Sequence, residues 1–520
     1  MSTPFELKIE NIFGGQSAAQ YFSSKGGFNS SIAIDPDYPD VAGSIKTSGF
    51  AVPIGYAEFS GSNVTARPIA IINNPKNTLT YVVLSNGRLI SYNSSLASET
   101  LIGTVTGGEA TGGWYYNNYI YITTPTNISR YGPLNNSPSL TNTWWTGAGL
   151  TALTDTTYPS FRGRELPIHW GAVHGDGASY FCDFINGQGM IHKIKTSKTT
   201  DEGDTNNGSA YNSLDLPFGY YPMSLCSYGT DLAIVAFRTV DTTVNQGDAT
   251  MFLWDTTNTD SFYKEVPLDD PIATAILNVG GTPFIWSGNA NNGVRLTYYA
   301  GGETIKEVVY QEEGTPPFPG AVCTKGNKIF WGGWTTYPSA TASVFSINSK
   351  HAKLSSATPI HNIAKATSSG ANQLVTALRP VQQSSNIQPK LVIGWVDDSA
   401  DGLDQYSATG TLASMMRWGF IIGNRFEINY VRIPFAGAVA ANTGIAPKFY
   451  FDDESSNKTP TAINNTNYPS KRKVIYKAPE LKDYTGENNF IFEMTWSSTN
   501  PLTVAWPIII KGLIYSDEDE

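Results

Sequence analysis

The most regular feature of the chain is a two-strand pattern that recurs seven times between Thr80 and Ser407. Each unit combines a turn containing Gly or Asn, an apolar run of four to six residues, and a second strand that ends in an aromatic residue or Ile. The first strands read YVVL, YIYI, YFCDF, LAIVAF, PFIW, KIFWGGW and KLVIGW, and their partners read RLISYN, NISRYG, MIHKIKT, MFLWDT, VRLTYY, SVFSIN and LDQYS. Successive units are 39, 63, 60, 44, 49 and 59 residues apart, counted between Tyr92, Tyr131, Ile194, Trp254, Tyr298, Ile347 and Tyr406. Intervals of roughly 40 to 60 residues, with about four strands each and no amphipathic helix, are typical of β-propeller blades.

After Gly410 the pattern changes to longer strands with one apolar face each. In NFIFEMTW, the residues Phe490, Phe492 and Met494 alternate with residues of mixed type, as expected for a strand that is buried on one side. RFEINYVRIPF alternates likewise as far as Tyr430 and Val431, where two successive apolar residues predict a β-bulge. Six or so strands of this kind predict a β-sandwich.

The sequence therefore predicts an all-β protein, with a propeller of about seven blades (six to eight) followed by a C-terminal β-sandwich. The predicted domains are an N-terminal segment at 1–70, the propeller at 71–409 and the sandwich at 410–520. Either FELKI or the stretch Gly49–Ile54 is expected to close the ring by completing a blade begun at its other end. Four polar excursions, expected to decorate one rim of the disc, lie at 135–167, 196–217, 303–319 and 352–369.

The charge of the chain argues against a nucleic-acid partner. Its formal net charge is -10, and no basic stripe is visible along the sequence, whereas nucleic-acid binding needs clustered Lys and Arg. The acidic run SDEDE at 516–520 is interpreted as a solvated end. No secretion signal is present at the start, and no apolar run approaches the roughly 20 residues that a membrane helix needs.

Three cysteines do not form a disulfide framework. Cys226 and Cys323 hold equivalent places in two units with a third unit between them, so they are expected in separate blades. Cys182 lies inside an apolar strand, where a free cysteine acts as a small hydrophobic residue.

The loop DDSADGLD carries the one candidate metal site. Asp397, Ser399 and Asp401 stand at alternate positions and Gly402 follows, which matches the first half of a calcium-binding loop. Asp404 is a further candidate ligand, but Ala408 stands where a bidentate Glu is needed. The alternative interpretation is a solvated acidic hairpin loop without Ca²⁺, and no other cofactor is expected.

Three histidines, His169, His174 and His192, fall within one unit and raise the question of a metal site. In an extended strand, His169 and His174 point to opposite faces, so a shared ligand shell would need a bend between them. Ordinary turn and surface histidines are the favoured interpretation.

Propellers also host carbohydrate-active proteins, which work with paired carboxylates or with exposed aromatic platforms. The chain has isolated acids that cannot be paired from sequence, and it has no repeated S-x-D-x-G-x-x-W box. Trp286, Trp331 and Trp395 lie in the repeated strands and are expected in the blade cores. The acids in question are Asp155, Asp176, Asp183, Asp231 and Glu307.

The chain resembles the β-propeller virion proteins of tailed bacteriophages, which are found among minor tail or tail-tip components. The resemblance rests on the opening KIENIFGGQSAAQYFSSKGG with IDPDYPDVAGSIKTSGF, on irregular blades, and on the closing RFEINYVRIPFAGAVAANTGIAPKFYFDD. The blades depart from the WD-repeat pattern, since only MFLWD, ending at Asp255, has a Trp-Asp close.

The resemblance implies a non-enzymatic structural protein of the virion tail, present in multiple copies and assembled in the host cytoplasm. Its partners would be other virion proteins and a host surface glycan or receptor, with no membrane span. The alternative from another class is a carbohydrate-active propeller, either a glycoside hydrolase or a glycan-binding lectin.

Overall fold

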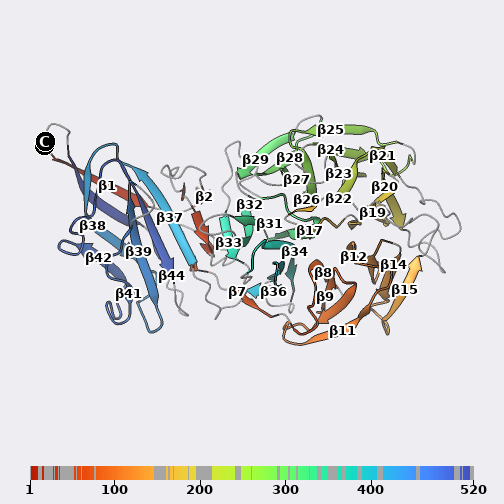
Figure 1. Cartoon of the computed structure of the whole chain (residues 1–520), viewed down its shortest axis with the longest axis horizontal. Coiled ribbons are helices and arrows are strands. Elements are labelled where there is room, and N and C mark those ends of the chain that lie inside the picture. The colour runs from red at the N-terminus through yellow and green to blue at the C-terminus, as the bar shows by residue number, and fades with distance from the viewer. Residues whose placement is uncertain are drawn as a thin grey trace.

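The computed structural model confirms the prediction of an all-β propeller protein (Figure 1). Within the described residues, the helical content is limited to one 3₁₀ turn, η1 (Pro319–Ala321). No described helix has the length and apolar character needed to span a membrane. The structure describes residues 2–9, 15–16, 27–28, 30–32, 34–35, 52–53, 56–59, 61–74, 78–125, 127–145, 160–161, 164–167, 169–185, 187–194, 214–239, 247–258, 261–289, 293–302, 305–311, 314–326, 328–335, 341–348, 361–365, 370–382, 389–406, 414–452, 457–496, 504–505 and 507–515.

The propeller consists of four-stranded antiparallel sheets, of which the described residues form seven. We number these blades 1 to 7 along the chain. Blades 1 to 3 are β8 (Pro68–Asn73), β9 (Thr80–Leu84), β10 (Arg88–Tyr92) and β11 (Glu99–Thr104); β12 (Gly112–Tyr116), β13 (Tyr119–Thr123), β14 (Ile128–Gly132) and β15 (Ser139–Trp145); and β18 (Gly171–Val173), β19 (Ser179–Ile185), β20 (Gln188–Ile194) and β21 (Leu214–Phe218). Blades 4 and 5 are β22 (Tyr221–Tyr228), β23 (Asp231–Thr239), β24 (Gly247–Trp254) and β25 (Lys264–Leu268); and β26 (Ile272–Val279), β27 (Thr282–Gly288), β28 (Val294–Tyr299) and β29 (Ile305–Gln311). Blades 6 and 7 are β30 (Val322–Lys325), β31 (Lys328–Thr335), β32 (Thr341–Asn348) and β33 (His361–Lys365); and β34 (Leu374–Val381), β35 (Lys390–Val396), β36 (Asp401–Tyr406) and β7 (Tyr56–Glu58).

All seven predicted strand pairs form hydrogen-bonded hairpins, and each pair supplies the second and third strands of a blade. The four polar excursions differ from expectation, because each contains the fourth strand of a blade rather than rim loop alone. These strands are β15, β21, β29 and β33.

The ring closes on itself. Each first strand, from β8 through β34, contacts the first strands of the two neighbouring blades, and β34 of blade 7 contacts β8 of blade 1. Glycine allows some of these blades to come close together: a Cβ on Gly332 would lie 2.4 Å from Val375 of the next blade, and one on Gly394 would lie 2.8 Å from Pro68. Apolar residues from the inner strands fill the space between the blades.

The strand that closes the ring is β7, which pairs with β36 as the outermost strand of blade 7. Neither predicted closing segment does this. Phe5 and its neighbours lie in β1 (Ser2–Ile9), which pairs with the last strand of the chain, and Val52–Pro53 forms β6, which pairs with β5 (Ile34–Asp35). The closing strand begins two residues after the predicted stretch Gly49–Ile54.

The second unit consists of two sheets that share one buried apolar cluster, which is the arrangement of a β-sandwich. The predicted bulge is present one residue early, between Ile428 and Tyr430. One sheet, called here the outer sheet, contains β1, β45 (Ile508–Tyr515), β38 (Phe426–Pro434), β42 (Lys473–Lys477) and β43 (Thr485–Gly486). The other contains β4 (Ser30–Ile32), β37 (Ser414–Ile421), β44 (Asn489–Trp496), β39 (Gly444–Phe451), β40 (Asn457–Lys458) and β41 (Ile463–Asn464).

The N-terminal strands correct the predicted domain boundaries. β1 and β4 belong to the sandwich sheets, so the sandwich is not formed by residues 410–520 alone. The chain starts in the sandwich, runs once around the propeller and returns to the sandwich, which places the two units side by side (Figure 1). Contacts of β33 in blade 6 with β4 and β5 join them further. Two more short pairs are β2 (Gly15–Gln16) with β3 (Gly27–Phe28), and β16 (Ser160–Phe161) with β17 (Arg164–Glu165).

Candidate functional site

The structure does not bring the four candidate calcium ligands together. Asp397 is turned into its own loop: its Oδ1 accepts hydrogen bonds from the backbone N–H groups of Ser399 (2.7 Å) and Ala400 (2.6 Å) and from the Ser399 hydroxyl (2.8 Å). Its Oδ2 accepts one from the Gly370 N–H at 2.6 Å. A carboxylate that already accepts four bonds is a poor first ligand for a cation.

Asp401 and Asp404 both lie in β36, three positions apart, and therefore point to opposite faces of the strand. Asp404 is fully buried and accepts a hydrogen bond from the Trp395 indole at 2.8 Å. Burial raises the pKa of Asp401, against the opposing charges of Arg164 and Arg67. Among the described residues, no group of three His, Cys, Asp or Glu side chains could hold a metal ion.

The positive charge beside this loop is the guanidinium of Arg164. Arg164 of β17 donates from Nη2 to the Asp397 carbonyl (2.7 Å) and to Asp398 Oδ1 (3.2 Å). β17 comes from the excursion 135–167, and Figure 1 shows it near the centre of the ring rather than on the rim. Arg67 donates to the Glu165 carbonyl at 2.9 Å, and burial lowers its pKa. Two arginines therefore tie β17 to the loop of blade 7 and to the start of blade 1.

A second segment, Thr315–Ala321, packs across the propeller axis. It is buried throughout, and its 3₁₀ turn contacts the inner strands β8, β26 and β34 of blades 1, 5 and 7 and β31 of blade 6. The Thr274 hydroxyl donates to the Pro317 carbonyl at 2.6 Å. A Cβ on Gly320 would lie 2.6 Å from the Ile69 carbonyl oxygen. Backbone therefore occupies this part of the axis.

Two of the three histidines form a buried cluster that the sequence did not predict. His169 Nε2 lies 2.8 Å from Asp183 Oδ1, and His192 Nε2 lies 2.9 Å from Asp183 Oδ2. All three side chains are at most 1% exposed, so the interpretation as surface histidines is wrong for His169 and His192. His174, also buried, does begin a turn, and it contacts the Ser227 hydroxyl and the Thr230 carbonyl.

The cluster holds Asp183 as a carboxylate. Burial alone would raise its pKa, but the charges and hydrogen bonds of His169 and His192 outweigh this effect and hold the pKa well below its ordinary value. Because a carboxylate only accepts, both imidazoles donate from Nε2, which leaves His169 Nδ1 facing the Thr111 hydroxyl at 2.6 Å. The cluster ties blade 3 to the start of blade 2, and its burial leaves it closed to a substrate.

The remaining isolated acids are also paired within the protein. Asp176 contacts Lys193 at 2.6 Å, Asp231 accepts from the Tyr263 hydroxyl at 2.6 Å, and Glu307 pairs with Arg295. Asp155 lies outside the described residues. Of the four acids described, Glu307 shares Arg295 with a second carboxylate, Asp270, so this pair is held by a guanidinium rather than free to act on a glycosidic bond. As predicted, the three tryptophans Trp286, Trp331 and Trp395 are buried in the blades.

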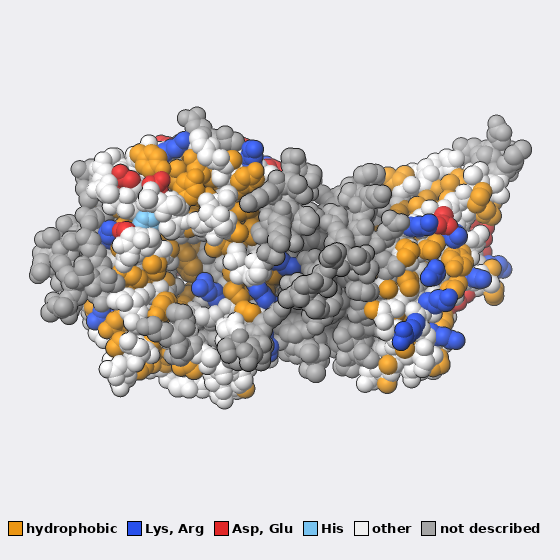
Figure 2. All heavy atoms as spheres, turned by 180° about the vertical axis from the view of Figure 1, so that it is seen from behind, with side chains coloured by type: hydrophobic (Ala, Val, Ile, Leu, Met, Phe, Trp, Pro, Cys, Tyr) orange, Lys and Arg blue, Asp and Glu red, His pale blue; other side chains and the backbone are white. Residues whose placement is uncertain are grey.

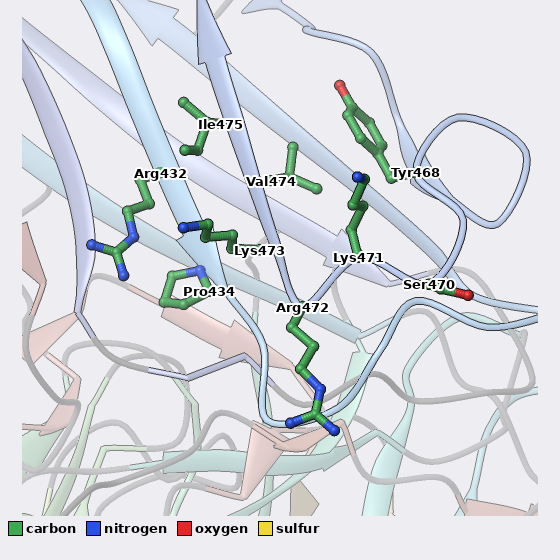
Figure 3. Close-up of a pocket in the computed structure, with 9 residues that line it drawn as sticks. All are labelled: Arg432, Pro434, Tyr468, Ser470, Lys471, Arg472, Lys473, Val474 and Ile475. Carbon is green, nitrogen blue, oxygen red and sulfur yellow. The ribbon is translucent and has the colours of Figure 1, made fainter.

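A hollow of about 520 Å³ lies at one end of the outer sheet (Figure 3). It lies where β42 begins, next to the end of β38. Four of its nine lining residues are cations and none is acidic. They are Arg432, Pro434, Tyr468, Ser470, Lys471, Arg472, Lys473, Val474 and Ile475.

More cations continue from the hollow across the outward face of the same sheet. Lys8, Lys477 and Lys511 come from β1, β42 and β45, and Figure 2 shows Lys and Arg side chains gathered on the sandwich. We call the hollow and these three lysines the basic face. No basic stripe is visible in the sequence because these residues come from four strands that are far apart in the chain. Only KRK at 471–473 is visible as a run.

No protein-family model matches the sequence, and no curated protein matches it either. Among solved structures, the chain is similar to the β-propeller domain of Cps50 (Swd1) from Myceliophteria thermophila. The identity is 8% and the TM-score is 0.41, over 68% of this chain and 99% of that one. The assignment of a propeller to this chain accordingly rests on its own strand pairing and ring closure.

Proposed function

We propose that this chain is a non-enzymatic structural protein of a bacteriophage virion, a tail or tail-tip component. It would be present in multiple copies, contact other virion proteins and a host surface glycan or receptor, and assemble in the host cytoplasm. The phage assignment comes from the sequence resemblance. The structural observation that supports a structural role is the double crossing between the two units.

The crossing supports a mechanical role as a rigid connection between the two units. The propeller is inserted between β4 and β37, which pair with each other in one sandwich sheet, so both ends of the ring are fixed to the same sheet. β7 closes the ring directly after the first crossing. Two units joined in this way cannot rotate freely about a single linker, which suits a rigid connector.

The buried polar groups of the propeller support the same proposal. Arg164, Arg67 and Asp397 bond to one another's segments, and Asp183 is enclosed by imidazoles. These groups bind segments of the protein to one another. A glycosidase would instead need two carboxylates facing an open space, at a separation of roughly 5 to 10 Å.

The proposal is tested by measuring which proteins the purified phage particle contains. Particles of the phage that encodes this chain are purified through two gradients and analysed by quantitative mass spectrometry. Particles made with a stop codon at an early position of the gene serve as the control. We expect the chain in several copies per particle, and particles with a defect in tail assembly or adsorption when it is missing.

Absence of the chain from purified particles would overturn the virion role. Turnover of host surface polysaccharide by the purified chain, measured by release of reducing ends, would overturn the non-enzymatic role.

A further inference from the structure

The four cations of the hollow have no partner within the described part of the protein. Arg432, Lys471, Arg472 and Lys473 make no ion pair and no side-chain hydrogen bond there, and the Nε of Arg432 is buried without an acceptor. Lys8 and Lys511 on the same face differ, because both pair with Glu6. Unpaired positive charge is concentrated at the hollow end of the basic face.

The geometry of the hollow favours several cations acting together. Arg432 lies opposite Ile475 and Pro434 lies opposite Lys473 in the pairing of β38 with β42, so Arg432 and Lys473 are diagonal neighbours. Arg472 extends away from Lys471 (Figure 3). Charges spread in this way suit a ligand that carries several anionic groups along an extended chain.

The aromatic residues nearby are already engaged. Lys477 and Lys511 lie over the ring of Tyr430, at 5.8 and 5.9 Å from its centroid. Tyr468 packs edge-on against Tyr476 at 6.2 Å. A single-stranded nucleic acid or a sugar that stacked on these rings would have to compete with these contacts, whereas an acidic peptide needs charge alone.

The chain carries such a peptide directly after β45, in the acidic run 517–520, which lies outside the described residues. This run is too short to place all four of its acidic side chains in the hollow of its own molecule. Lys473 lies opposite Pro434 of β38. In the pairing of β38 with β45, Pro434 lies level with position 507. This position is eight residues, or roughly 27 Å, from Tyr515 along the sheet. Asp517 stays within about 7 Å of Tyr515 and Glu520 within about 18 Å, because they follow two and five residues later.

We propose that the hollow binds the acidic run Asp517–Glu520 of a second copy of this chain. The contact joins two different surfaces, so it arranges copies head to tail in a ring or a row. The sequence alone favours a solvated end for this run, and the unpaired cations give it a partner. The proposal does not depend on a virion role.

The first test measures peptide binding by the full chain. A labelled peptide with the sequence GLIYSDEDE, residues 512–520, is titrated at about 50 mM salt and followed by fluorescence anisotropy. The variant K471Q/K473Q removes two exposed charges and is expected to weaken binding about tenfold, as is raising the salt to about 0.5 M. The matched variant K306Q/K482Q, which removes two exposed charges elsewhere, is expected to bind normally.

The second test measures self-association by sedimentation velocity at the same low salt. Deletion of residues 516–520 and the variant K471Q/K473Q are each expected to shift the chain toward monomer, with an unchanged thermal midpoint as evidence of folding. A mixture of these two variants should form a complex of two chains and nothing larger, because the deletion variant supplies the hollow and K471Q/K473Q supplies the acidic run.

Three results would each overturn the proposal. One is equal binding of the neutral peptide GLIYSNQNQ, and another is equal loss of binding in K306Q/K482Q. The third is capture of a DNA oligonucleotide or a sulfated oligosaccharide at the hollow by a chain that does not bind the acidic peptide, which would assign the surface to another polyanion.

Discussion

Replacing Asp183 with Ala is expected to destabilise the propeller strongly. The carboxylate accepts hydrogen bonds from His169, His192 and the Phe184 N–H, at 2.8, 2.9 and 2.7 Å. All three donors are buried, and each buried group left without a partner costs about 1–3 kcal/mol. A water molecule entering the space of the lost carboxylate would restore part of this, so we expect a net loss of about 3–5 kcal/mol, in the range found for broken buried pairs.

The loss is measured by urea unfolding followed by tryptophan fluorescence, since Trp145 packs 6.3 Å from the His192 ring. Calorimetry identifies which transition belongs to the propeller. The control is Asp269→Ala, an exposed position where a change within about 0.5 kcal/mol is expected. If Asp183→Ala cost no more than this control, the buried cluster would not stabilise the ring.

The same residue predicts a pH dependence. The pKa of Asp183 in the folded protein lies below its ordinary value of 3.8, so its stabilising contribution is complete above that value and is lost as the pH falls toward the folded-state pKa. The difference between wild type and Asp183→Ala should therefore be largest at neutral pH and should shrink below about pH 4. A difference that grew on acidification would contradict the assignment of an ionised carboxylate.

Three further predictions concern the blades. Asp404→Ala removes an acceptor of the buried Trp395 indole and should cost about 1–3 kcal/mol in urea unfolding, while an unchanged midpoint would show that the indole is satisfied otherwise. Gly87→Ala places a side chain at φ +82° in the turn between β9 and β10 and should cost about 1–2 kcal/mol, with the exposed Ser95→Ala as a comparison. Calcium at millimolar concentration should move the thermal midpoint by less than about 1 °C, because Asp397 is already bonded within its loop, and a larger rise would reveal binding to the folded state.

The interior of the blades could be predicted because its strands carry a strong signal. A second strand such as β23 is covered on both sides by neighbouring blades and reads LAIVAF without polar interruption. The fourth strands carry a weak signal, because they lie at the outer edge: β15 reads SLTNTWW, and most of its side chains are at least partly exposed. Pattern analysis therefore detects the hairpins and takes several outer strands for loops.

The candidate sites were harder to predict, because they depend on contacts between distant segments. Asp397 looked like a calcium ligand, and the groups that satisfy it are backbone N–H groups that have no sequence signature. His169 and His192 could not be assigned to one carboxylate without two strand registers. The pairing of β18 with β19 brings the residues before Gly171 toward Asp183, and the pairing of β19 with β20 places His192 opposite Phe181, two residues from Asp183. Asp183 and His192 lie on adjacent strands, with His192 opposite a residue two positions from Asp183. This spacing could have suggested the pair, but it could not have shown that the pair is buried.

The pairing of β1 with β45 sets the order in which the two units can fold during synthesis. The ring can be completed as soon as β36 has left the ribosome, because its closing strand β7 has been made long before. The outer sheet must wait for β45, while β1, which is made before the propeller, and β38 both remain without their common neighbour. A nascent chain stalled before Ile508 would therefore display a finished ring beside two open strand edges, which are favoured sites of aggregation.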